Sequence, residues 1–197
     1  MMQQEIIEWF EKERKKNVPI LIPEPIFKQI TIEIANILVE RFSTDTLVYL
    51  PEHEIQFFEW LKENDADVWN DLWGEVDEEP YVVSISFLPL LIKRFGGFPI
   101  CDLVNNENYY FTEEMIIKKT SHLLLETLRE KYLRNEKLTI AQALLLEMSV
   151  APLDIWHFAY YHKISIEEAK KAVEELVEDK LIVHYKTRDM LANFVQF

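Results

Sequence analysis

The chain of 197 residues is long enough for one large domain or two small ones, and its net charge of −14 disfavours nucleic acid and anionic membrane as partners. Hydrophobic residues make up 49% and charged residues 28%, an ordinary composition for a soluble globular protein. Only three glycines occur, and neither a G-x-G-x-x-G nor a Walker pattern is present, which excludes the common glycine-rich phosphate loops.

The first two thirds of the chain combine helical and strand patterns. In chain order we first expect a short helix over 6–10, a proline-marked extended linker over 19–25, a helix over 25–42 and a strand over 46–50. A helix from Pro51 follows, which is interrupted at 64–65 and ends at Gly74. We then expect a strand over 81–88, a hairpin of 98–104 with 109–112, and a helix that begins after Thr112. This order predicts a mostly helical α+β domain over residues 1–134, with a small antiparallel sheet. The polar stretch 134–137 is the expected linker to the last third of the chain.

The negative charge is concentrated in the middle of the chain. Residues 43–112 carry 14 acids and 3 bases, a net of −11, whereas residues 1–42 have a net of −1 and residues 113–197 a net of −2. Such a segment repels anions and favours a partner with a basic surface. The alternative is that this charge only keeps the protein soluble.

Four of the acids cluster at the expected helix break, namely Glu63, Asp65, Asp67 and Asp71. Hard cations prefer such oxygen ligands, but Trp69 and Asn70 occupy positions where a calcium-binding loop requires a ligand and a glycine. We therefore interpret the cluster as a solvated loop that caps the second half of the helix. Asp65, Asp67 and Asp71 are also candidate contacts for a basic partner.

Aromatic residues are dense in the same region, where Trp69 and Trp73 share a helix face. Tryptophan is enriched at binding hot spots, so both residues are candidate partner-binding residues. The alternative is that they form the core between this helix and the sheet. A third hypothesis is a pocket for a small apolar ligand, which would make the protein a ligand sensor or an enzyme.

No pattern names a catalytic residue, a cofactor or a metal site. The five histidines lack zinc-binding spacing, and no G-x-S-x-G elbow is present. The lone cysteine, Cys101, stands beside Asp102 with no activating neighbour, and we interpret it as a small buried hydrophobe. The sequence thus favours a protein that is not an enzyme.

The chain begins with Met-Met-Gln-Gln-Glu, which lacks the basic and apolar regions of a signal peptide. Its longest nearly apolar run, residues 81–92, is too short for a bilayer span. We therefore expect a cytoplasmic protein without membrane contact.

The last third of the chain has the clearest signals for where helices begin. Thr139 with Gln142, and Ser165 with Glu168, fit the capping-box pattern at the start of a helix. Between them, Pro152 suits the first position of another helix. The helix after Ser165 presents one apolar side, made of Ile166, Ala169, Val173, Leu176 and Val177. A strand over 181–185, a polar turn over 186–189 and a strand over 191–195 then read as a hairpin.

This block, residues 139–197, resembles the winged helix-turn-helix family over about 59 of the 197 residues. The best match is the capped helix and following strand over 165–183. The resemblance implies a third helix that lies in the major groove and a wing that touches the DNA backbone. Those roles would fall to Lys170 and Lys171 on the helix and to Lys186 and Arg188 on the wing.

The charges of the third helix depart from the family pattern. DNA affinity comes largely from Lys and Arg on phosphates, and here four carboxylates oppose two lysines: Glu167, Glu168, Glu174 and Glu175. Our leading hypothesis is therefore a non-catalytic protein that works through protein–protein interaction or assembly, with a basic partner or a second copy of itself. The alternatives are a DNA-binding transcriptional regulator and the ligand sensor or enzyme described above.

Overall fold

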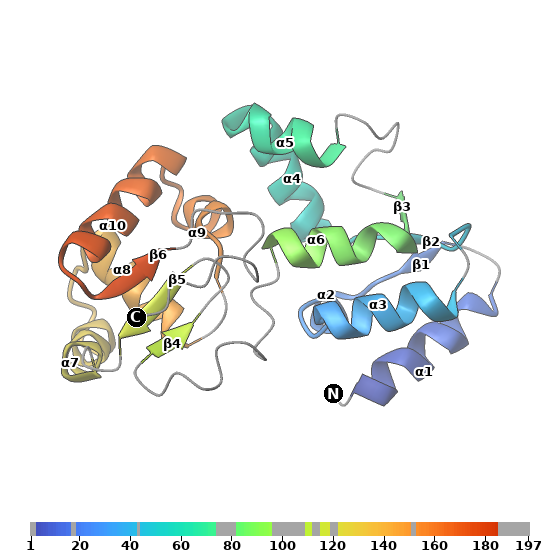
Figure 1. The fold of residues 1–197 in the computed structure, drawn as a ribbon, viewed down its shortest axis with the longest axis horizontal. Helices are drawn as coiled ribbons and strands as arrows, with labels where there is room; N and C mark the ends of the chain where they lie inside the picture. The colour runs from blue at the N-terminus through green and yellow to red at the C-terminus, as the bar shows by residue number, and fades with distance from the viewer. Residues whose placement is uncertain are drawn as a thin grey trace. The chain divides into compact units, whose positions relative to one another are not determined.

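The computed structural model describes residues 3–16, 19–42, 44–73, 82–95, 109–111, 115–118, 122–150 and 153–184, and Figure 1 shows the elements they form. The fold is α+β and mostly helical, as the sequence predicts. The chain divides into two compact units, Met1–Arg94 (unit 1) and Phe95–Phe197 (unit 2). This division lies earlier than the linker expected at 134–137. None of the described helices is long and apolar enough to cross a membrane.

Unit 1 consists of helices and one small sheet. Its helices are α1 (Gln3–Arg14), α2 (Glu24–Phe27), α3 (Ile32–Arg41), α4 (Glu52–Asn64), α5 (Ala66–Trp73) and α6 (Leu88–Phe95), whose last residue belongs to unit 2. Its strands are β1 (Ile20–Leu21), β2 (Leu47–Tyr49) and β3 (Val82–Ser84), and a 3₁₀ turn, η1 (Ile85–Phe87), follows β3.

The sheet of unit 1, sheet A, has the strand order β1-β2-β3 and is mixed rather than purely antiparallel. β1 pairs with β2 in parallel, with Ile20 opposite Val48, and β2 pairs with β3 in antiparallel, with Val48 opposite Val83. The parallel pair arises because the chain passes through α2 and α3 between β1 and β2, and parallel strands need such a crossover. Ile20, Val48 and Val83 are buried and form the sheet's contribution to the core.

Local hydrogen bonds account for two differences from the predicted boundaries in unit 1, and a third boundary is as predicted. The helix expected over 25–42 is divided, because Thr31 caps α3 by accepting a bond from the Ile34 N–H at 3.4 Å. The strand expected over 81–88 ends at Ser84, whose Oγ accepts from the Ser86 N–H at 3.2 Å and so opens the 3₁₀ turn. The predicted break at 64–65 is confirmed, since α4 ends at Asn64 and α5 begins at Ala66.

The described part of unit 2 contains a second three-stranded sheet and four helices. The strands are β4 (Tyr109–Phe111), β5 (Met115–Lys118) and β6 (Ile182–His184), and the helices are α7 (His122–Leu133), α8 (Ile140–Met148), α9 (Ile155–His162) and α10 (Ile166–Glu178). All described pairs of this sheet are antiparallel, in the order β4-β5-β6.

The pairing of β5 with β6 corrects the prediction that a helix begins directly after Thr112. Residues Met115–Lys118 form a strand instead, with Ile116 opposite Val183, and the helix begins at His122. The same pairing places β5 in one sheet with β6, which follows α10. Residues before the expected linker at 134–137 therefore belong to the same unit as the C-terminal helices. The expected partner strand over 191–195, the hairpin segment 98–104 with Cys101, and Gly74 lie outside the described residues.

Both predicted capping boxes of unit 2 are confirmed. Thr139 Oγ1 accepts from the Gln142 N–H at 3.2 Å, and the Gln142 side chain accepts from the Thr139 N–H at 3.2 Å. Ser165 and Glu168 make the equivalent pair of bonds, at 3.2 and 2.9 Å. These caps fix where α8 and α10 begin, and therefore which side of each helix faces the core.

We expect Ser165→Ala to lower the free energy of unfolding by about 1 kcal/mol, because it removes the cap acceptor from α10. The bonds from the Ser165 N–H and hydroxyl also hold the pKa of Glu168 below its ordinary value. A carboxyl group whose pKa is lower in the folded protein stabilises the fold at pH values above its unfolded-state pKa. That stabilisation is lost as the pH falls through the folded-state pKa. Urea unfolding at neutral and acid pH should therefore show a smaller difference between wild type and variant in acid. An equal difference at both pH values would contradict this account of the cap.

Candidate interaction surfaces

The solvent face of α10 is acidic. The buried side is formed by small and branched apolar residues, Ile166, Ala169, Ala172, Val173 and Leu176. The exposed side carries five carboxylates, those of Glu167, Glu168, Glu174, Glu175 and Glu178, against the two ammonium groups of Lys170 and Lys171. Val177 was expected on the buried side but is 38% exposed, and Ala172 takes the core position instead.

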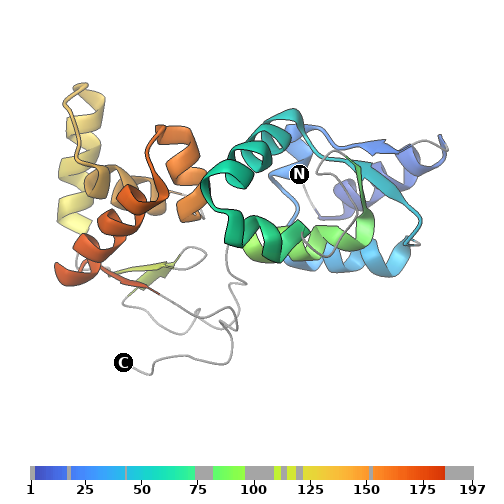
Figure 2. The same cartoon turned by 90° about the horizontal axis from the view of Figure 1, so that it is seen from above.

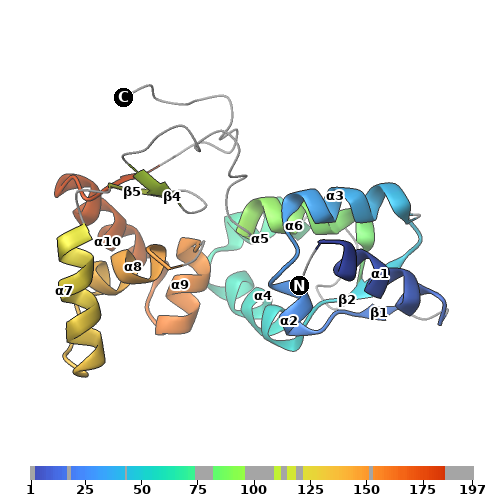
Figure 3. The ribbon, with the colours of Figure 1, turned by 90° about the horizontal axis from the view of Figure 1, so that it is seen from below.

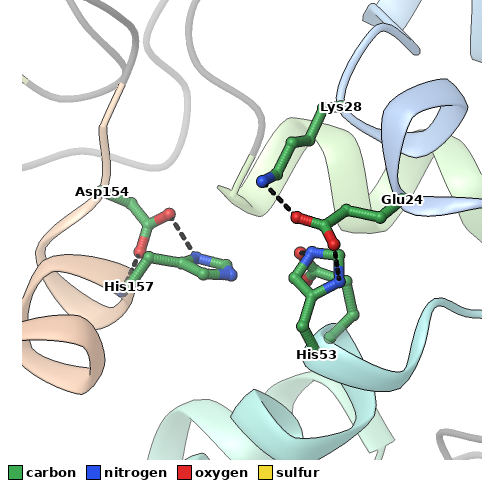
Figure 4. A network of polar contacts seen from close by, with 6 residues as sticks. Glu24, Lys28, His53, Asp154 and His157 are labelled. Atoms are coloured by element: carbon green, nitrogen blue, oxygen red, sulfur yellow. Dashed lines mark hydrogen bonds and ion pairs between the residues drawn. The ribbon is translucent and has the colours of Figure 1, made fainter.

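Two acid–histidine contacts fix the helices beneath α10, and the sequence patterns predicted neither. His162 Nε2 lies 2.6 Å from Glu147 Oε1, which links α9 to α8. Asp154 precedes α9 and accepts from the His157 N–H at 2.8 Å, while its other oxygen lies 2.7 Å from His157 Nδ1 (Figure 4). Asp154 is 2% exposed, so this is a buried cap. The sequence signal that could have found it was an Asp just before an apolar run, the usual N-cap position.

The structure describes two of the four basic residues to which the family resemblance gives a role in DNA contact. Lys170 and Lys171 are both exposed on α10, where they lie among the carboxylates of the same face. Lys186 and Arg188 lie outside the described residues. Within α10, DNA would therefore meet two lysines on a face that has an excess of three negative charges.

The acidic candidates at the junction of α4 and α5 serve two purposes. Asp65 Oδ1 accepts from the Val68 N–H at 3.2 Å, which confirms that this acid caps the second helix. Asp67 and Asp71 are exposed on the surface of α5. Of the three aspartates, Asp67 and Asp71 are exposed, where a partner would contact them, and Asp65 is half-buried.

The two tryptophan candidates are not equivalent. Trp73 is 4% exposed and packs against Phe58, Trp69 and Phe87, with ring centroids 5.3, 5.6 and 5.0 Å away. Trp69 is half-buried, and the Lys62 ammonium lies 5.3 Å from its ring, within cation–π range. Trp73 is therefore a core residue of unit 1, while Trp69 stands at the edge of the same cluster.

A polar network between α2 and α4 was also missed by the sequence patterns. The Lys28 ammonium pairs with Glu24, and Glu24 Oε2 lies 3.7 Å from His53 Nδ1 (Figure 4). His53 Nε2 lies 2.9 Å from Glu54 Oε1, and Glu54 is only 7% exposed.

The hydrogen bond from Lys28, assisted by the charge of His53, holds the pKa of Glu24 below its ordinary value. This arrangement ties a short helix to a long one. Among the described residues, no group of three or more His, Cys, Asp and Glu side chains is arranged to hold a metal ion.

Comparison with known proteins adds no relative. A scan against protein-family models, a search of curated proteins and a search of solved structures each found no match to this chain.

Proposed function

We propose that the protein acts without catalysis, through protein–protein interaction or assembly, and that unit 2 contains a winged-helix-like module used for protein contact. The observation that carries the proposal is the acidic solvent face of α10, with five carboxylates against two lysines. The helix that a DNA-binding winged helix places in the major groove is here net negative. A partner with a basic surface fits this face better than a nucleic acid does.

The electrostatic argument concerns the sign of the local field. Binding to DNA gains most of its non-specific affinity by releasing counterions from phosphates that Lys and Arg neutralise. A helix face with an excess of three negative charges lowers that gain and adds repulsion at close range. The same face attracts Lys-rich and Arg-rich surfaces, whose association it accelerates at low salt. We also propose a cytoplasmic location, which the single cysteine in 197 residues supports.

The direct test compares two labelled probes on the full chain, a random-sequence DNA duplex and a Lys/Arg-rich peptide, each titrated at low and moderate salt. We expect the peptide to bind with an affinity that falls as salt rises, and the duplex not to bind even at low salt. Salt-sensitive binding of the duplex would overturn the proposal in favour of a DNA-binding regulator. Failure of both probes would remove the basic partner from the proposal.

We expect the double substitution Glu174→Lys with Glu175→Lys to weaken peptide binding by roughly tenfold, or about 1.4 kcal/mol. The reason is that it changes the excess on the α10 face from three negative charges to one positive charge. The measurement is the peptide dissociation constant at low salt. Glu5→Lys with Glu8→Lys is the matched control, since it changes the total charge equally at exposed positions of α1. Equal weakening in both variants would show that total charge, rather than α10, attracts the peptide.

A further inference from the structure

One face of sheet A is apolar and exposed. Side chains alternate between the two faces of a strand, so Leu47 and Tyr49 point away from the buried Val48, and Leu21 points away from the buried Ile20. The strand register places Leu21 opposite Tyr49, Tyr49 opposite Val82, and Leu47 opposite Ser84, a half-buried polar residue at the edge of this face. The exposed fractions are 66% for Leu21, 40% for Leu47 and 38% for Tyr49.

Three of the described helices of unit 1 cover the opposite face of sheet A. Figures 2 and 3 show α1, α3 and α6 on the same side of sheet A, which is the side of the buried residues Ile20, Val48 and Val83. In the described part of unit 1, three of the four large apolar side chains that are exposed lie on the outer face of the sheet, and only Leu90 lies elsewhere. A sheet with one solvated face normally alternates apolar and polar residues, so a mostly apolar outer face is unusual and favours a contact there.

The dimensions of this face decide what it can hold. Three strands about 4.8 Å apart, with two or three residues each at about 3.3 Å per residue, give a surface of roughly 10 by 14 Å. That is the width of one helix, about 10–12 Å with side chains. The area of this face is far smaller than the area of about 800 Å² per partner that a stable dimer buries. A single helix therefore fits the face better than a second copy of the chain does.

The net charge of unit 1 bears on the chemistry of that helix. Unit 1 carries 19 acidic and 9 basic residues, a net of −10, whereas Leu21, Leu47 and Tyr49 are uncharged. A helix that docks here needs an apolar stripe for the sheet and gains from positive charge beside the stripe. We propose that the outer face of sheet A docks one amphipathic helix of a partner protein, with Lys and Arg flanking its apolar stripe. The surface belongs to unit 1 and shares no residue with α10.

The test uses a labelled helical peptide with Leu at i, i+3, i+4 and i+7 and Lys at the remaining positions. A scrambled peptide of the same composition lacks the stripe and controls for charge. On the full chain we expect the striped peptide to bind at least roughly tenfold more tightly than the scrambled one. Equal affinity of the two peptides would overturn the proposal, because charge alone would then explain the binding.

Leu21→Glu locates the contact. It adds a negative charge, which by electrostatics alone strengthens binding of a Lys-rich peptide, so a tenfold loss of affinity would come from the apolar face. Leu90→Glu, at a position 43% exposed on α6, is the matched control and should bind as wild type does. Leu21→Ser repeats the test if the charged variant unfolds, as judged by circular dichroism. Wild-type affinity in the Leu21 variants would overturn the proposal. So would a wild-type dimer that dissociates on Leu21 substitution, since a second copy would then occupy the face.

Discussion

Trp73→Ala should lower the free energy of unfolding by about 3–5 kcal/mol, the usual cost of truncating a large buried aromatic side chain. Trp73 is 4% exposed and contacts the rings of Phe58, Trp69 and Phe87, so its removal leaves a cavity between α4, α5 and η1. Urea unfolding followed by far-ultraviolet circular dichroism measures the loss, because that signal does not depend on the tryptophan that is removed.

Trp69→Ala is the matched control for that experiment. Its ring is half-buried and partly covered by Lys62, so we expect a loss of about half as much, roughly 2 kcal/mol. If Trp73→Ala cost no more than Trp69→Ala, Trp73 would not be a core residue, and the hypothesis that both tryptophans bind a partner would regain support. The buried indole N–H of Trp73 finds no hydrogen-bond partner among the described residues, so Trp73→Phe removes an unsatisfied donor and should cost less than Trp73→Ala.

Elements with a strong local signal could be predicted from the sequence. Thr139 and Ser165 each combine a capping hydroxyl with Gln or Glu three residues later, and both boxes form in the structure. The break between α4 and α5 was predictable for the same reason, since Asp65 caps the helix that follows it. In each case the information lies within four residues of chain, where side chains and backbone satisfy one another.

Features that depend on distant pairing could not be predicted in this way. Residues 115–117 have apolar side chains that suit a helix as well as a strand, and with Lys118 they form β5 because β6 lies beside them in the fold. The parallel pairing of β1 with β2 follows from a crossover of about 25 residues, which no local pattern records. The early division between the units has the same origin, because β5 joins unit 2 through that pairing.

The candidate sites show the same division between local and distant information. The acidic side of α10 was visible in the sequence, because helical periodicity separates its glutamates from the buried positions. Burial of Trp73 but not Trp69 was not visible, since it depends on Phe87, which lies beyond α5 in η1. The apolar outer face of sheet A was missed because it exists only in the register of three short strands.

Among the described polar residues of unit 2, Asp154 should be the most damaging to replace, and Asp154→Ala should lower the free energy of unfolding by about 3 kcal/mol. About 1–2 kcal/mol comes from the lost cap of α9, whose first turn depends on the bond from the His157 N–H to Asp154. The remainder comes from the buried contact between the carboxylate and His157 Nδ1, at 2.7 Å. Ser165→Ala removes an exposed cap from the neighbouring helix, so the difference between the two variants measures the effect of burial.

A double-mutant cycle separates the two contributions of Asp154. With His157→Ala in the background, Asp154→Ala still removes the backbone cap but no longer removes the contact with the imidazole. We therefore expect the cost of Asp154→Ala to fall to about 1–2 kcal/mol in that background, which corresponds to a coupling energy on the order of 1–2 kcal/mol. Unfolding in urea at neutral pH gives all four free energies. A coupling near zero would mean that His157 contributes nothing through its ring, and that Asp154 acts on α9 only as a cap, as Ser165 does on α10.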